Sequence, residues 1–92
     1  MKKVEVCRKV TDLGKFGQKT LVYFKIACLS VFEEQEVITY GVSVCIEESG
    51  EESAVYSLTS SEKSIDSFID LLASNYVTPI SLEYVAGDWS LL

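Results

Sequence analysis

The side chains that most often carry out covalent chemistry are scarce in this sequence of 92 residues. It contains no histidine, which is the commonest general base and the commonest metal ligand. Its three cysteines, Cys7, Cys28 and Cys45, are too widely spaced for a Cys-x-x-Cys metal or redox pair. They also have no histidine to activate them. We therefore expect reduced, half-buried thiols, and no catalytic residue, cofactor or metal ion.

The acidic residues and the glycine-containing segment 14–20 also lack the spacing of a known site. The acids around Ser49-Gly50 do not have the spaced Asp and Asn ligands of an EF-hand. The segment 14–20 (GKFGQKT) ends in Lys-Thr, but it lacks the GxxxxGK[ST] spacing and a following helix. Asp88, beside Trp89, is the acid that stands out, and we expect a structural role for it. An enzyme is therefore the least favoured class of protein.

Charge is distributed unevenly along the chain. The net charge of −6 disfavours nucleic acid as a partner, because phosphate binding needs a concentrated basic surface. Residues 1–25 carry a net charge of about +5 and residues 26–92 about −11. We expect these opposite charges to attract one another within the fold. The alternative is a basic edge that meets an acidic partner, including a second copy of the chain.

The first residues do not resemble a secretory signal. Glu5, Arg8 and Lys9 follow the basic start, where a signal peptide would have its apolar run. The sequence also has no run of 18 apolar residues that could span a membrane. We therefore expect a cytoplasmic protein with no membrane partner.

Four segments have the composition of β-strands. The strongest are 20–32 and 37–47, which are rich in β-branched and aromatic residues. Weaker strands are expected at 2–10, with Val4, Val6 and Val10 on one face, and at 53–58. We predict a loop at 11–19, a turn at Glu34-Gln35 and a second turn at Ser49-Gly50, where glycine accepts a positive φ.

The hairpin of the two strongest strands predicts a sheet that is apolar on one face. With the turn at Glu34-Gln35, Leu29 lies opposite Tyr40 and Ala27 opposite Val42. The second face is mixed, although a sheet with one face in water normally alternates more clearly between apolar and polar residues. Both faces should therefore be at least partly covered.

An amphipathic helix is expected after the fourth strand. Thr59 and Glu62 fit a capping box, and Asn75 fits the end of the helix. Apolar residues follow at spacings of three and four, as on the buried face of a helix; they are Ile65, Phe68, Ile69, Leu72 and Tyr76. In the last segment Ser81 can cap a short helix, and a fifth strand is the alternative.

Together these elements predict one α+β domain over residues 1–92. A four-stranded antiparallel meander is followed by an amphipathic helix packed on the sheet and by the short C-terminal helix, or alternatively by a fifth strand. The first helix can cover only one face of the sheet. We expect the terminal segment or a second subunit to cover the other face.

Three segments resemble a family of small proteins of unknown function from Clostridia-type bacteria. They are the strand 40–44 (YGVSV), the helix start 59–61 (TSS) and the tail 79–89. The tail positions that carry the resemblance are Pro79, Leu82, Val85, Asp88 and Trp89. Gly87 departs from the acid expected before Asp88. The resemblance covers about residues 20–92 and implies a bacterial cytoplasmic protein, but it brings no activity, cofactor or catalytic residue.

The function favoured by these features is a non-enzymatic interaction or regulatory module that acts as a homodimer through an apolar sheet face or a sheet edge. The apolar content of 48% is high for so small a domain. The alternative is a small-ligand-binding domain with a pocket between sheet and helix. The other partner that we expect is a protein of unknown identity. The residues predicted for the interface are Tyr23, Leu29, Tyr40, Val42, Val44 and Trp89.

Overall fold

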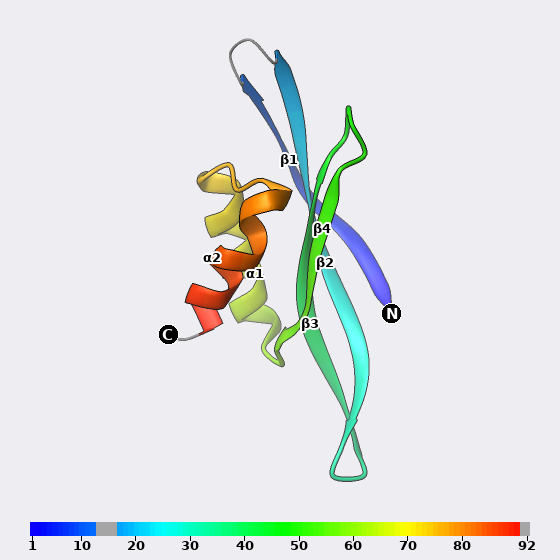
Figure 1. Ribbon diagram of the computed structural model, residues 1–92. Helices are drawn as coiled ribbons and strands as arrows, with labels where there is room; N and C mark the ends of the chain where they lie inside the picture. The colour runs from blue at the N-terminus through cyan, green and yellow to red at the C-terminus, as the bar shows by residue number, and fades with distance from the viewer. Residues whose placement is uncertain (13–16, 91–92) are drawn as a thin grey trace.

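The computed structural model describes residues 1–12 and 17–90. Within these ranges, four antiparallel strands form one sheet in the order β1-β2-β3-β4, and two helices follow (Figure 1). The elements are β1 (Lys2–Asp12), β2 (Gln18–Phe32), β3 (Gln35–Ile46), β4 (Glu52–Thr59), α1 (Glu62–Ser74) and α2 (Pro79–Ser90). The predicted α+β meander is confirmed, and the last segment is a helix rather than a fifth strand. Residues 13–16, which include the centre of the predicted loop 11–19 and the start of the segment 14–20, lie outside the described residues.

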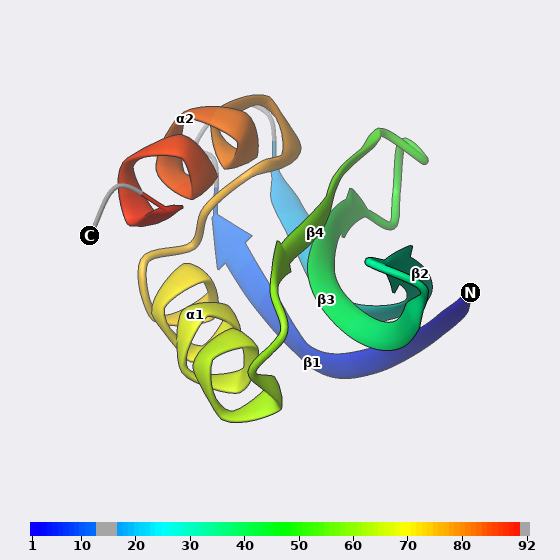
Figure 2. The same ribbon diagram turned by 90° about the horizontal axis from the view of Figure 1, so that it is seen from below.

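Both helices pack on the same face of the sheet, which we call the helix-side face (Figures 1 and 2). The molecule is elongated, with extents of 52 × 25 × 18 Å. The turn between β2 and β3 lies at the opposite end of the sheet from the end of β1 and the start of β2 (Figure 1).

The hairpin of β2 and β3 has a different register from the predicted one. Its turn is Glu33-Glu34, and both residues have a positive φ, of 52° and 66°, which is typical of a type I′ turn. Leu29 therefore pairs with Ile38 and not with Tyr40. Asn-Gly usually marks such a turn, and the run of acidic residues gave no such signal. Because the partner shifts by two positions, each side chain keeps its predicted face.

A bulge in β1 divides the valines that were expected on one face. The register shifts between Glu5 and Cys7, so the face of each residue changes there. Val4 pairs with Lys25 on the helix-side face, but Val10 lies on the opposite face. The residue of β1 that packs against the core is Cys7.

A second irregularity brings β4 close to Gly41 of β3. Tyr40 pairs with Thr59 but Val42 pairs with Val55, so β4 has extra residues at this point, and one of them, Ser57, has a φ of 54°. A Cβ atom on Gly41 would lie 2.2 Å from the carbonyl oxygen of Val55. Only glycine allows the two backbones to approach this closely.

The helix α1 begins two residues later than the capping box predicted. Its N-cap is Ser61, whose side chain accepts a 3.2 Å hydrogen bond from the Ser64 amide. Thr59 is the last residue of β4, and its hydroxyl accepts from the Ser61 amide (3.1 Å). The predicted C-cap, Asn75, is confirmed. The helix α2 starts at Pro79 rather than after Ser81, because proline suits the first turn of a helix.

The core lies between the helices and the helix-side face. The ring of Phe68 on α1 stacks on that of Trp89 on α2, with centroids 4.4 Å apart. Tyr23 of β2 donates a 2.9 Å hydrogen bond to the carbonyl of Val77, between the helices. Burial raises the pKa of Tyr23 to about 12. Tyr76, which was predicted on the buried face of the helix, is 47% exposed. It follows the C-cap of α1 and has a positive φ, so its side chain does not continue the buried face.

The centre of the face opposite the helices is covered by the sheet itself. Val22, Ile26 and Ser43 are at most 3% exposed there, and Figure 2 shows the strands curling around this side. Lys3 of β1 forms an ion pair with Glu52 of β4, across the two strands that separate them. The expectation that the terminal segment covers this face is therefore wrong. The helix α2 lies on the other face, and the twist of the sheet buries the centre of this one by bringing the outer strands together.

Ion pairs join the basic first part of the chain to the acidic remainder. Arg8 pairs with Glu47 (2.7 Å), and Lys25 pairs with both Glu62 (2.9 Å) and Asp66 (3.0 Å) on α1. Together with the pair between Lys3 and Glu52, these contacts confirm that the two oppositely charged parts attract one another within the fold.

Candidate functional site

The half of the β2–β3 hairpin that ends in the turn projects beyond both helices (Figure 1). We call residues 28–39 the exposed hairpin. The first residue of β1 pairs with Ala27, and the last residue of β4 pairs with Tyr40. Neither strand continues beside the exposed hairpin, so both of its outer edges lack a strand neighbour among the described residues. The helix α1 starts at Glu62, soon after the end of β4. The helices therefore cover the four-stranded part of the sheet and leave the exposed hairpin uncovered.

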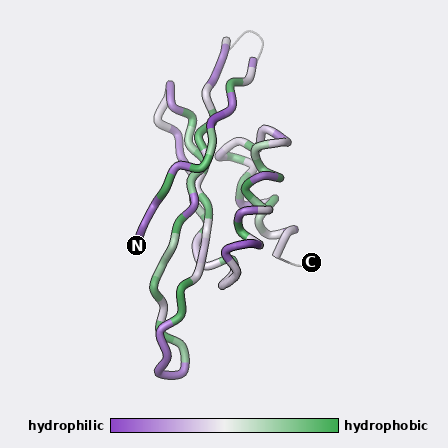
Figure 3. The backbone as a smooth tube through the Cα atoms, turned by 180° about the vertical axis from the view of Figure 1, so that it is seen from behind, coloured by the Kyte–Doolittle hydropathy of each residue, from purple (hydrophilic) through white to green (hydrophobic). Residues whose placement is uncertain are grey.

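Large apolar side chains remain accessible on the exposed hairpin. Leu29 is 63% exposed, Val31 74% and Ile38 50%, and all three lie on the helix-side face. Phe32, on the opposite face, is 67% exposed. Figure 3 shows hydrophobic segments on this projecting part of the backbone. Exposed apolar patches on small domains often mark sites of interaction, which makes the exposed hairpin the candidate site.

The structure separates the six predicted interface residues into three groups. Tyr23, Val42 and Val44 are fully buried under the chain's own helices, so their assignment to an interface is corrected here. Tyr40 and Trp89 are partly buried and pack against the same core. Only Leu29 is largely exposed. The physical reason is that the helices occupy the part of the apolar face that had been assigned to a partner.

Sequence reasoning missed three residues of the exposed surface, namely Val31, Phe32 and Ile38. The signal that could have found them is length. A 15-residue strand extends about 50 Å, whereas the 13-residue helix α1 extends about 20 Å. The helix layer is therefore too short to cover the whole hairpin.

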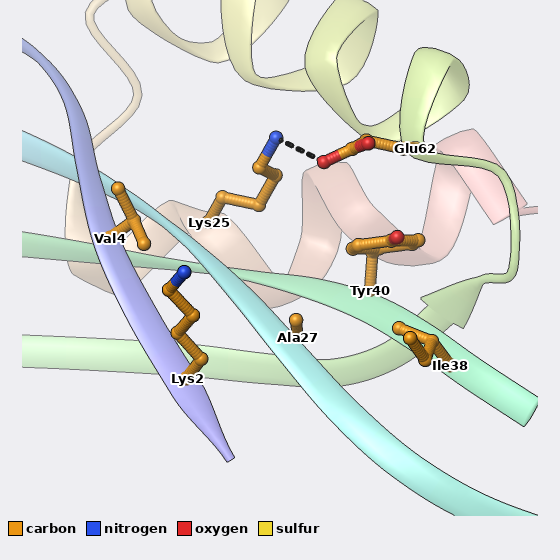
Figure 4. Close-up of a pocket in the computed structure, with 7 residues that line it drawn as sticks. All are labelled: Lys2, Val4, Lys25, Ala27, Ile38, Tyr40 and Glu62. Atoms are coloured by element: carbon orange, nitrogen blue, oxygen red, sulfur yellow. Dashed lines mark hydrogen bonds and ion pairs between the residues drawn. The ribbon is translucent and has the colours of Figure 1, made fainter.

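A shallow hollow of about 320 Å³ lies where the base of the exposed hairpin meets α1 (Figure 4). Its wall consists of Lys2, Val4, Lys25, Ala27, Ile38, Tyr40 and Glu62. The Nζ atom of Lys25 donates to Glu62 and Asp66, and these hydrogen bonds raise the pKa of Lys25. The charged groups near α1 therefore satisfy one another. A second hollow continues towards Leu29 along the hairpin.

Two of the three thiols, those of Cys7 and Cys45, do not have the lowered pKa of an activated nucleophile. Burial raises the pKa of Cys7 and that of Cys45, which disfavours the thiolate. All three cysteines are free. Asp88 lies exposed on α2. No group of three or more possible metal ligands was found in residues 1–12 and 17–90. In the same ranges, neither helix has the length and apolar character needed to cross a membrane.

Comparison with known proteins adds one finding. No curated protein and no solved structure matches the chain. A family model, however, matches residues 1–91. The match includes β1, which lies before the part of the chain that carried the resemblance noted above. The chain therefore belongs to DUF6514, a family of unknown function.

Proposed function

We propose that this protein is a non-enzymatic interaction module that acts as a homodimer through the exposed hairpin. The observation that carries the proposal is the accessible apolar surface of Leu29, Val31, Phe32 and Ile38 on a hairpin with free outer edges. Exposing such side chains to water is unfavourable by roughly 25 cal/mol per Å² of apolar surface. A partner that covers them recovers this free energy.

The rest of the molecule supports an interaction role over an enzymatic one. The space between the helices and the sheet is filled by the core, and the two hollows described above lie outside it. The acidic groups whose pKa is shifted, Glu48 and Glu52, are exposed and lowered by hydrogen bonds, first from Thr20 and from Lys3 respectively. Neither has the raised pKa of a general acid.

The setting that we propose is the cytoplasm of a Clostridia-type bacterium. Three free cysteines fit a reducing compartment. The net charge of −6 and the acidic turn of the exposed hairpin argue against nucleic acid as the partner. A second, different protein is a further partner that a homodimeric module could bring together in two copies.

The proposal is tested by native mass spectrometry at several protein concentrations. We expect a dimer whose fraction rises with concentration. Leu29→Lys places a charge on the exposed hairpin and should shift the protein to the monomer, with an unchanged circular dichroism spectrum. Ile80→Lys is the matched control, because Ile80 is 80% exposed on α2, away from the hairpin, and this variant should remain dimeric. A wild-type protein that is monomeric at every concentration would refute the homodimer.

A small ligand in the hollow of Figure 4 is the second candidate function. Its support is the combination of an apolar floor, Ala27 and Ile38, with charged groups at the rim, Lys2 and Glu62. A monomer that carries a reproducible extra mass in the same spectra would favour this function over the homodimer. Ala27→Trp, which fills the hollow, should then remove the extra mass.

A further inference from the structure

The two outer edges of the exposed hairpin differ in how they are protected. On the β3 side, Thr39 is held to Ser57 of β4 by a 3.0 Å hydrogen bond, and Glu36 adds a charge. On the β2 side, residues 28–32 (CLSVF) contain no charge and no proline. Natural proteins commonly use charge, proline or a covering segment to keep an edge strand from pairing with another chain. The β2 edge has none of these devices.

The turn fixes which backbone groups this edge presents. Phe32 and Gln35 flank the two-residue turn, and such a turn is closed by a hydrogen bond between the residues that flank it. The backbone groups of Phe32 therefore point towards β3. Because the direction alternates along an antiparallel strand, the N–H and C=O groups of Leu29 and Val31 point outwards from β2.

A second copy of the same edge matches these groups. If Ser30 faces Ser30 of the partner subunit across a two-fold axis, Leu29 pairs with the partner subunit's Val31, and Val31 pairs with the partner subunit's Leu29. All the outward N–H and C=O groups of both residues are then satisfied. The apolar side chains of these residues also come into cross-strand contact.

Charge complementarity supports the same arrangement. In this register Phe32 of one copy lies opposite Cys28 of the other, so the turn that follows Phe32 ends next to Lys2, which is the first residue of β1 on the same edge and pairs with Ala27. Glu33, Glu34 and Lys2 form no ion pair within their own chain among the residues described. Each acidic turn therefore meets a lysine of the other copy, and a two-fold axis makes this contact occur twice.

We propose that the homodimer forms by antiparallel pairing of the two β2 edges, with Ser30 on the two-fold axis and the Glu33-Glu34 turn of each copy against Lys2 of the other. This pairing rests on the proposed homodimer and specifies its geometry. It joins the two sheets through their exposed hairpins and leaves the helices of both copies uncovered by the interface.

Disulfide cross-linking tests the register. In the full chain carrying Cys28→Ser, a cysteine is introduced by Ser30→Cys, or by Val37→Cys as the control. Facing residues in a non-hydrogen-bonded antiparallel pair have Cα atoms about 4.5 Å apart, which suits a disulfide. Val37 pairs with Ser30 but lies on β3, one strand further from the axis in each copy, so its two Cα atoms would be about 14 Å apart.

We expect oxidised glutathione to convert most of the S30C protein to a covalent dimer, measured by intact mass, and to leave the V37C protein without this dimer. Circular dichroism checks that both variants fold. If S30C cross-links no more than V37C while the wild type is dimeric, the pairing is overturned and the proposed homodimer stands. If the wild type is monomeric, both are overturned.

Charge reversal tests the contact of the turn with Lys2. E33K/E34K should weaken dimerisation roughly three- to tenfold at low salt, as expected for two symmetric exposed charge contacts. Adding K2E to E33K/E34K should restore much of the loss. Equal dimer affinities for the wild type and E33K/E34K would overturn this contact.

Discussion

The two halves of the β2–β3 hairpin have similar sequences and very different surroundings. On the helix-side face, Tyr23, Val42 and Val44 are fully buried, whereas Leu29, Val31 and Ile38 are at least half exposed. Both sets lie on the same strands and alternate in the same way. The burial of an apolar strand residue here is decided by the reach of the helix layer and not by the local pattern. This is why the apolar half that the helices leave open is the part of the sheet available to a partner.

The largest expected difference comes from truncating one phenylalanine that packs over the buried half and one that lies in the exposed half. Phe68 is 1% exposed and stacks on Trp89, so Phe68→Ala should lower the free energy of unfolding by about 3–5 kcal/mol, through lost burial and the cavity left behind. Phe32→Ala, on the exposed hairpin, should change it by less than about 0.5 kcal/mol in dilute monomer. Urea denaturation measures both. Similar losses would show that the hairpin is packed as tightly as the core.

Gly41 lies near the boundary between the two halves, and Gly41→Ala should give the next largest effect. The added Cβ would meet the Val55 carbonyl oxygen at 2.2 Å, so β4 must move away and a loss of about 1–3 kcal/mol is expected. The control is Gly87→Ala in α2, where the added Cβ meets nothing within 4 Å. It should stabilise the protein by up to about 1 kcal/mol, because alanine favours a helix. Thermal unfolding distinguishes the two, and equal effects would contradict the close approach of β4.

Tyr23 offers a smaller test on the buried side. Tyr23→Phe removes the hydrogen bond to the Val77 carbonyl and should cost about 1 kcal/mol. The folded pKa of Tyr23, about 12, is above the unfolded value of about 10. Its contribution to stability is therefore fully present below pH 10 and is lost as the pH rises from 10 to 12.

This alkaline loss is measured by urea denaturation at a series of pH values. It should be reduced in Tyr23→Phe but retained in Tyr84→Phe, whose ring is 78% exposed. An alkaline profile that Tyr23→Phe leaves unchanged would contradict the buried phenol.

The smallest effect is expected from Glu52 on the curled face. Hydrogen bonds from Lys3 and Ser43 lower its pKa, so its contribution is present above the unfolded pKa of about 4.3 and is lost as the pH falls below it. The carboxylate is exposed, which limits the contribution to less than about 1 kcal/mol. Glu52→Gln should flatten the acid limb of stability against pH, whereas Glu34→Gln on the exposed hairpin should not. An identical acid limb in both variants would contradict the ion pair with Lys3.

Much of the fold could be predicted from local patterns. The β-branched and aromatic runs located β2 and β3, the spacing of Ile65, Phe68, Ile69 and Leu72 located α1, and the glycine of Ser49-Gly50 located a turn, where Gly50 has a φ of 77°. Two predictions were wrong, the register of the β2–β3 hairpin and the common face of the valines of β1. Both depend on less specific signals. A turn formed by Glu33-Glu34 has no sequence signature, and a bulge such as that after Glu5 depends on contacts between strands.

The candidate site was predicted less well, and the reason is physical. Of the residues predicted for the interface, Leu29 is exposed, whereas Tyr23, Val42 and Val44 are buried. They were predicted together because apolar residues on one face look alike in sequence. Whether such a residue meets a helix or water depends on where β4 ends and α1 begins. In this protein that point is set by the pairing of Thr59 with Tyr40.

The sequence by itself determined the order of the four strands and the first helix, the faces of the central hairpin and the attraction between the basic first part and the acidic remainder. These follow from the period of two in strands, the spacing of three and four in helices and the signs of the charges. Only the tertiary structure decided that both helices pack on one face of the sheet, that the twist of the sheet buries the centre of the other face, and that the hairpin extends beyond the helices. Each of these depends on lengths and angles between distant segments, which no local pattern encodes.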